Sequence, residues 1–159
     1  MLHYTGPTFR PPYEANSFVL QVTSGCSHNA CTFCSMYLTI PFAVSPLEEV
    51  ESDILEVAKV GSHYYKRVFL ANGNAFCLSA RRLTEIAELI HKHLPSVESI
   101  GAYTTVNDVL AKSVDELRDL AALGYKDINI GVESALDDVL TYMNKGYTLE
   151  QAREAFASE

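Results

Sequence analysis

Three cysteines lie close together near the N-terminus, in the segment Gly25-Cys-Ser-His-Asn-Ala-Cys-Thr-Phe-Cys34. Cys26, Cys31 and Cys34 bring thiolate sulfur, which is a ligand for iron–sulfur clusters and for zinc. Three thiolates can hold three irons of a [4Fe–4S] cube and leave the fourth iron open to an outside ligand. With His28 as a fourth donor, the same loop would form a Cys3His zinc site. The loop therefore predicts a metal centre, and the iron–sulfur and zinc interpretations both stay open.

The elements around this loop predict a parallel sheet. Residues 17–23 are a short apolar run typical of a buried strand, and further strands are predicted at 67–71, 99–105 and 127–132. Each is followed by helical periodicity, and the later strands recur about every 30 residues, as in a β/α barrel. The predicted fold class is α/β, a parallel (β/α) repeat with four βα units of a partial TIM-like barrel. Residues 1–16 are predicted to be an extended lead-in, and 17–159 the barrel domain.

Serine and threonine residues mark the predicted helix starts. Ser45 and Ser113 are each followed three residues later by a glutamate, which is the pattern of a capping box. Ser134 is a candidate cap for a helix over 135–144, and a last helix is predicted to begin at Thr148. In a parallel sheet, these helices cover the strands and leave the strand ends free for ligands.

Composition narrows the classes of function. The 12 basic and 20 acidic residues give a net charge of −8, which argues against binding nucleic acid or an anionic membrane through bulk charge. No run approaches the roughly 18 apolar residues of a membrane span, and the N-terminus lacks the pattern of a secretory signal. We therefore expect a cytoplasmic protein, where clustered cysteines indicate metal chemistry before disulfides.

The segment Thr23-Ser-Gly-Cys-Ser-His-Asn-Ala-Cys-Thr-Phe-Cys-Ser-Met-Tyr37 resembles the signature of the radical S-adenosylmethionine (SAM) superfamily. The usual family pattern is Cys-x3-Cys-x-aromatic-Cys, and the first gap here is one residue longer. The resemblance implies a [4Fe–4S] cluster on the three cysteines, with SAM bound at the open iron. It also implies an enzyme that takes an electron from an external donor and cleaves SAM to methionine and a 5′-deoxyadenosyl radical. The resemblance leaves the substrate and the catalytic residues unknown.

The same resemblance implies roles for residues that follow the other strands. Phe33 would lie near the adenine, and Asn72, Gly73 and Asn74 would meet the methionine amino group, although the family's glutamate is missing there. Glu133 and Ser134 would meet the ribose hydroxyls. Each position also has a structural interpretation: core packing for Phe33, a plain turn for 72–74, and a helix cap for Ser134.

Three expectations about the structure follow. The sulfurs of Cys26, Cys31 and Cys34 should converge, with His28 turned away. Asn72, Asn74 and Glu133 should face the cavity beside the cluster, because they all follow carboxyl ends of strands. The family barrel usually has six strands and only four are predicted here, so we expect the N-terminal part of a truncated core. Strand 127–132 would then have an open edge, which predicts self-association.

Overall fold

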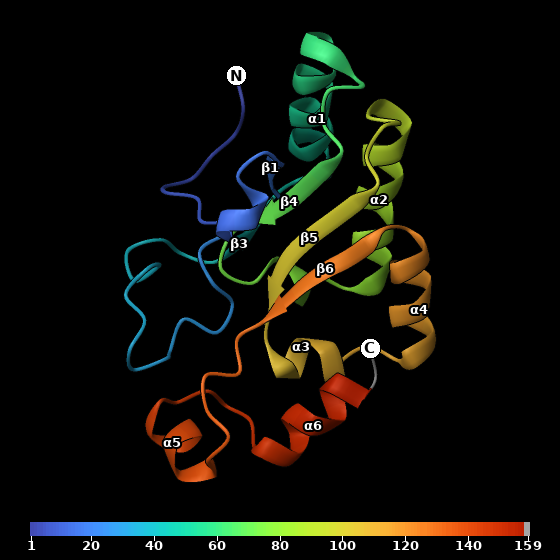
Figure 1. Cartoon of the computed structure of the whole chain (residues 1–159). Helices are drawn as coiled ribbons and strands as arrows, with labels where there is room; N and C mark the ends of the chain where they lie inside the picture. The colour runs from blue at the N-terminus through green and yellow to red at the C-terminus, as the bar shows by residue number, and fades with distance from the viewer. Residues whose placement is uncertain (158–159) are drawn as a thin grey trace.

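A parallel sheet of four strands forms the centre of the computed structural model, which describes residues 1–157 (Figure 1). The strands are neighbours in chain order, which confirms the predicted α/β class and is the arrangement of a barrel wall. Parallel pairing matches Phe18 with Val68, and Val68 with Ile100. The strands of this sheet are β1 (Phe18–Gln21), β4 (Arg67–Ala71), β5 (Ser99–Thr104) and β6 (Tyr125–Ile130).

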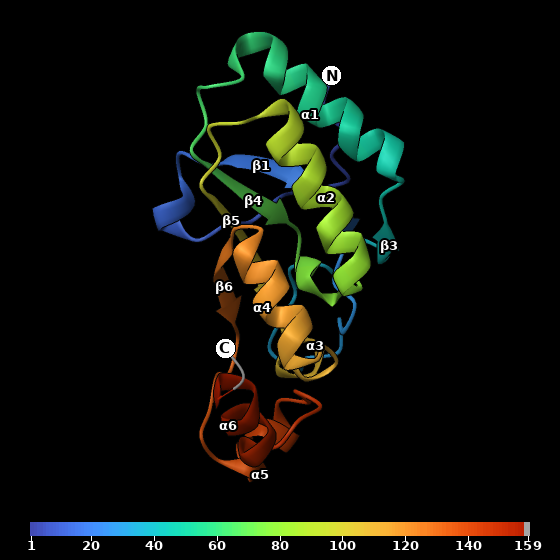
Figure 2. The ribbon, with the colours of Figure 1, turned by 90° about the vertical axis from the view of Figure 1, so that its right-hand side faces the viewer.

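Three longer helices cover one face of the sheet, as Figure 2 shows. They are α1 (Leu47–Gly61), α2 (Ala80–His93) and α4 (Val114–Ala122). Three others gather beyond the carboxyl ends of β5 and β6: α3 (Val106–Leu110), α5 (Asp137–Tyr142) and α6 (Leu149–Ala157). The 3-10 turns η1 (Pro12–Glu14) and η2 (Ala75–Cys77) complete the helical elements. None of the described helices is both long enough and apolar enough to cross a membrane.

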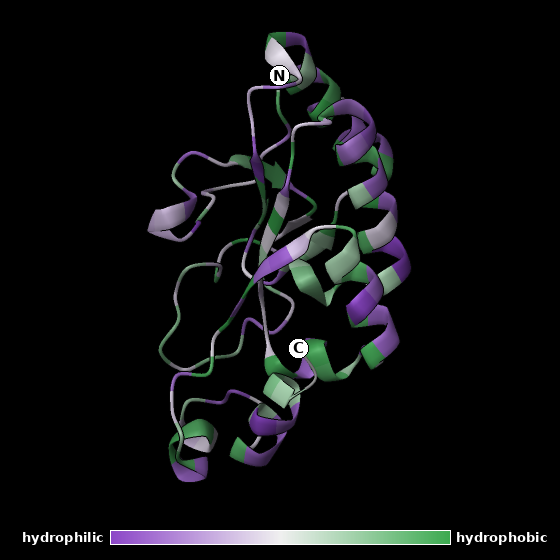
Figure 3. Ribbon diagram, turned by 45° about the vertical axis from the view of Figure 1, so that its right-hand side comes forward, coloured by the Kyte–Doolittle hydropathy of each residue, from purple (hydrophilic) through white to green (hydrophobic). Residues whose placement is uncertain are grey.

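Two separate apolar cores hold these elements. The larger lies between the sheet and the helices, where Ile54 of α1 and Ile86 of α2 are fully buried against the strands. The helices alternate between hydrophobic and hydrophilic positions along their length, so that one side of each can be buried (Figure 3). The smaller core joins α3, α5 and α6 through Val106, Leu140 and Ala155. The helices that follow the carboxyl ends of β5 and β6 therefore pack in a core of their own.

The first predicted strand is divided in the structure. Instead of one strand over 17–23, β1 ends at Gln21, and β2 (Thr23–Ser24) pairs antiparallel with β3 (Ala43–Val44). The chain turns out of the parallel sheet after β1, and this small ladder closes the base of the cysteine loop. The fourth strand also begins and ends two residues earlier than predicted, so that 131–133 form a loop.

One predicted capping box is confirmed and two predicted caps are wrong. Ser113 caps α4, with Glu116 bonded back to the Ser113 amide. Pro46 instead occupies the N-cap position of α1 and makes no side-chain hydrogen bond there. The Ser45 amide donates to the Val22 carbonyl, and the Ser45 carbonyl accepts from Arg82. Ser134 does not cap α5 at its N-cap position, which is Leu136; its hydroxyl instead accepts from the Leu136 amide at 3.2 Å.

The lead-in over 1–16 packs against the sheet as well as extending along it. Glu14 of η1 is fully buried, and its Oε1 accepts from Arg67 Nη2 at 2.5 Å. The same guanidinium lies 3.0 Å from the Asp127 carboxylate. A Cβ built on Gly101 would lie 3.1 Å from Glu14 Oε1, so a side chain there would crowd this carboxylate. The lead-in thus ties β4, β5 and β6 together near their starts.

Candidate functional site

The cysteine loop leaves the β2–β3 ladder and extends along the carboxyl ends of the strands (Figure 1). Cys26, Cys31 and Cys34 are free thiols and are half-buried. Burial raises the pKa of Cys31, the Lys145 ammonium opposes that shift, and the other two thiols add to it. The Cys31 thiol is therefore influenced by both of the other thiols and by Lys145.

The three sulfurs are not gathered into a finished metal site. Within residues 1–157, no group of three or more His, Cys, Asp or Glu side chains is arranged to hold a metal ion. The expected convergence of Cys26, Cys31 and Cys34 is thus not preformed. Three free thiols on one loop nevertheless fit the donor set of a cluster with one open iron.

The turn after β4 lies directly against the first cysteine. The Gly73 amide donates to the Gly25 carbonyl at 3.1 Å. A Cβ at Gly73 would lie 2.8 Å from Cys26 Cβ and 2.7 Å from Tyr37 Cε2, so only glycine allows this close approach. The structure thus brings segment 72–74 to the cysteine loop, as the strand order requires.

Asn72 and Asn74 are fully buried beside this turn, and their amide nitrogens are held in place. Asn72 Nδ2 donates to the Thr23 carbonyl at 3.0 Å. Asn74 Nδ2 donates to Ser27 Oγ at 2.6 Å and to Asp108 Oδ2 at 2.7 Å. Because both nitrogens are engaged, each Oδ1 is left as the free acceptor of its amide.

Buried polar atoms without a hydrogen-bond partner are concentrated here. Among the described residues there are four of them, and all belong to the cysteine loop, its base or the turn after β4: Thr23 Oγ1, Tyr37 OH, Asn72 Oδ1 and Asn74 Oδ1. Each such group costs about 1–3 kcal/mol unless something satisfies it. Their concentration at one edge of the sheet indicates a place for a polar ligand.

A second group of side chains follows β6 and lies beside Phe33 of the loop. Glu133 follows β6 in a left-handed conformation, with φ 69°. Its carboxylate lies 3.7 Å from Lys145 Nζ, and the Lys145 side chain is only 9% exposed. The same ammonium lies 5.7 Å from the centre of the Phe33 ring and 5.8 Å from that of Tyr147. Lys145 thus joins two predicted site residues, Phe33 and Glu133, across the loop.

His28 is bonded to the segment that follows α5. Its Nε2 lies 2.6 Å from the Asn144 carbonyl oxygen, and because a carbonyl only accepts, Nε2 donates. This bond engages Nε2 and leaves Nδ1 with its lone pair, and a carbonyl partner of this kind is also usual for metal-bound histidines.

Comparison with known proteins identifies the family. Residues 20–158 match the model of the radical SAM superfamily. The chain belongs to the radical SAM superfamily.

Two solved structures share the fold of this radical SAM chain. They are the cobalamin-dependent SAM radical enzyme OxsB with aqua-cobalamin and SAM bound, and the same enzyme with aqua-cobalamin bound. The TM-scores are 0.71 and 0.70, each at 23% sequence identity, over 87% and 86% of this chain. The chain covers 21% of the length of either enzyme. The comparison with curated proteins finds no match.

Several residues around the cysteine loop were missed by sequence reasoning. Lys145 was given no role, although its flanking Asn144 and Gly146 both adopt positive φ and form a turn. Asp108 was missed because α3, which carries it, was not predicted. A fourth thiol, Cys77 of η2, also lies near the cysteine loop, and burial raises its pKa to about 11.

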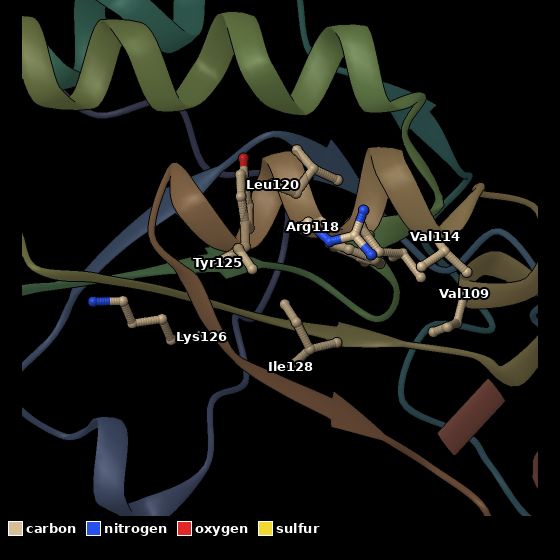
Figure 4. Close-up of a pocket in the computed structure, with 10 residues that line it drawn as sticks. Val109, Val114, Arg118, Leu120, Tyr125, Lys126 and Ile128 are labelled. Atoms are coloured by element: carbon tan, nitrogen blue, oxygen red, sulfur yellow. The ribbon is translucent and has the colours of Figure 1, made fainter. Parts of the chain in front are cut away.

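A hollow of about 500 Å³ lies away from the cysteine loop, between α4 and β6 (Figure 4). Val114, Leu120 and Ile128 give it a mainly apolar lining, and Arg118 and Lys126 also border it. None of the predicted cofactor residues contributes to it. The hollow therefore belongs to the open side of β6 and not to the cofactor site.

Proposed function

We propose that the chain binds a [4Fe–4S] cluster through Cys26, Cys31 and Cys34, and binds SAM beside it. Membership of the superfamily supports both cofactors. The observation that carries the proposal is the concentration of unpartnered buried polar atoms around a loop of free thiols. When bound, the cluster and SAM supply reductive cleavage of the sulfonium to methionine and a 5′-deoxyadenosyl radical.

Asn72 and Asn74 would receive the amino group of the methionine part of SAM. Their fixed amide nitrogens direct each Oδ1 to act as an acceptor, and an ammonium offers three N–H donors. Two neutral amides thus replace the family's glutamate in this segment. Gly73 would keep the backbone close enough to Cys26 for cluster and ligand to share the site.

The residues across the loop would hold the rest of SAM. The Glu133 carboxylate would accept from the ribose hydroxyls, since carboxylates form strong charge-assisted hydrogen bonds. Phe33 is half-exposed and would pack against the adenine. The Lys145 ammonium, 3.7 Å from Glu133, would hold that carboxylate in position for the ribose. Ser134 is the weaker candidate, because its hydroxyl already accepts from the Leu136 amide.

The setting of the reaction is also part of the proposal. An external donor would deliver the electron, and a cytoplasmic location agrees with four free cysteines, because reducing compartments keep thiols free. The enzyme's substrate is not identified by this site. It would meet residues outside the cysteine loop, and fold alone does not specify it.

Anaerobic reconstitution with iron and sulfide tests the proposal. We expect a brown protein with about four irons per chain, which forms 5′-deoxyadenosine from SAM under reducing conditions. Replacing Cys26, Cys31 or Cys34 by Ala should abolish iron uptake. The matched control is Cys77→Ala, which should still take up iron. A colourless protein with one zinc per chain would instead support the Cys3His site.

A further inference from the structure

The cysteine loop is joined to a chain segment more than a hundred residues away. The Thr32 amide donates to the Met143 carbonyl at 3.1 Å, and Thr32 Oγ1 donates to the Tyr142 carbonyl at 3.2 Å. Figure 1 shows the loop reaching toward α5, which ends at Tyr142. These bonds link the second half of the loop to the end of α5.

Two more hydrogen bonds hold the first half of the loop to the same segment. His28 Nε2 donates to the Asn144 carbonyl, and Asn144 Nδ2 donates to the Ala30 carbonyl at 2.9 Å. Asn144 is therefore bonded through both its backbone and its side chain. Its left-handed conformation, with φ 53°, turns both groups toward the loop.

The segment that makes these bonds is itself firmly anchored. The Lys145 amide donates to the Leu140 carbonyl, and Asn107 Nδ2 donates to the Gly146 carbonyl at 3.0 Å. The Tyr147 hydroxyl donates to the Gly131 carbonyl at 2.7 Å, and Tyr147 and Leu140 are buried in the smaller core. The loop is thus bonded to a segment that the smaller core and these hydrogen bonds hold in place.

The positions of these bonds in the loop alternate with the cysteines. His28 and Ala30 lie between Cys26 and Cys31, and Thr32 lies between Cys31 and Cys34. The bonds occupy the residues between the thiols and leave the thiols free. Binding a cluster must order the loop, which costs conformational entropy, and a loop already held at three points loses less of it.

We propose that residues 142–144 form a latch that holds the cysteine loop ready for the cluster, with His28 and Asn144 as positioning residues. The purpose of the latch rests on the proposed cluster function, whereas its hydrogen bonds do not. His28 thereby has a role that requires no coordination of metal.

Three substitutions remove the side-chain bonds of the latch one at a time. His28→Ala removes the donor to Asn144, and His28→Gln restores an N–H donor. Asn144→Gly removes the bond to Ala30 and tolerates the positive φ, so that backbone strain does not confuse the result. Thr32→Val removes the hydroxyl at nearly constant volume. The control is Leu136→Ala, an exposed residue of the same region whose side chain takes no part in the latch.

Hydrogen exchange of the loop amides in the cluster-free chain tests the latch itself. Each variant that removes a bond should exchange about fivefold faster over residues 26–34, and the triple variant should exchange faster than any of the three alone. His28→Gln and the Leu136 control should stay close to the wild type. Unchanged exchange in the triple variant would overturn the latch.

Iron release to a chelator from the reconstituted protein tests the positioning role. We expect release about fivefold faster for His28→Ala, and recovery in His28→Gln. If hydrogen exchange is faster but iron release is unchanged, the contact is only structural, and the positioning role is overturned. A wild-type chain that takes up no iron would contradict the proposed function instead, and the exchange measurement would still decide the latch.

Discussion

At the scale of single residues, the site is defined by polar groups that the protein does not satisfy by itself. Asn72 and Asn74 are fully buried, with their nitrogens bonded and their oxygens free. Across the loop, the ammonium of Lys145 is buried with a carboxylate no nearer than 3.7 Å. Buried groups of this kind reduce stability unless a ligand satisfies them. Substitutions at these residues should therefore affect ligand binding and folding differently.

Replacement of Glu133 should weaken SAM binding. Glu133→Ala removes a charged acceptor, and we expect a loss of about 1–3 kcal/mol by calorimetry on the reconstituted protein. Glu133→Gly is the matched control for the backbone, because glycine adopts φ 69° without strain. An equal loss in both variants assigns the effect to the carboxylate. Unchanged affinity in both would remove Glu133 from the site.

The thiol of Cys77 should react slowly with alkylating reagents. Burial raises its pKa from 9.0 to about 11, so at pH 8 it holds about a hundredth of the thiolate of an ordinary cysteine. Iodoacetamide labelling followed by mass spectrometry, with the Cys77→Ala protein to assign the signal, measures its rate. The rate should rise with pH up to about 11, since deprotonation creates the reactive form. Rapid labelling at pH 8 would contradict the buried position.

At the scale of elements, the tertiary contacts decide which local signals are used. Ser45 and Ser113 have the same capping-box pattern, yet only Ser113 bonds to the third residue of its helix. The Ser45 amide instead donates to the Val22 carbonyl, and its carbonyl accepts from Arg82. The antiparallel pairing of β2 with β3 directs the chain at this point.

The two serines should therefore respond differently to alanine. Ser113→Ala loses a reciprocal cap and should lower the free energy of unfolding by about 1 kcal/mol. Ser45→Ala should change it by less than about 0.5 kcal/mol, because the hydroxyl caps nothing. Urea denaturation followed by circular dichroism measures both. Equal losses would mean that the α1 cap forms in solution.

At the scale of the whole molecule, the sheet has an open side. Within the described residues, β6 pairs with β5 alone, and the hollow between α4 and β6 exposes apolar lining beside it. The chain covers 21% of the length of the two enzymes that share its fold. An unpaired strand with apolar surroundings is a template for another chain.

We predict that this 159-residue polypeptide self-associates through β6. Light scattering coupled to size exclusion should show species larger than one chain, and their fraction should rise with protein concentration. Ile128→Lys places a charge in the apolar lining and should shift the population toward the monomer. Val60→Lys, which adds the same charge at an exposed residue of α1 outside this hollow, is the control for net charge effects. A monomer at all concentrations would show that β6 does not pair.

The local pattern of the sequence determined the framework of this protein. The apolar run at 67–71 forms β4 with the predicted bounds, and the Ser113 and Glu116 pair caps α4 as expected. The three cysteines follow the first strand, and the family match confirms the recognition that rested on them. These features were predictable because strand propensity, capping and thiol chemistry depend on residues near one another in the chain.

Only the tertiary structure decided how distant residues meet. His28 bonds to Asn144 across 116 residues, and Asn74 bonds to Asp108 across 34, while Lys145 lies beside Phe33 and Glu133. No local period encodes such contacts, because they arise from the order of strands and the packing of the small core beneath the loop. The bounds of β1 and β6 shifted for the same reason: long-range pairing overrides the local apolar pattern at strand ends.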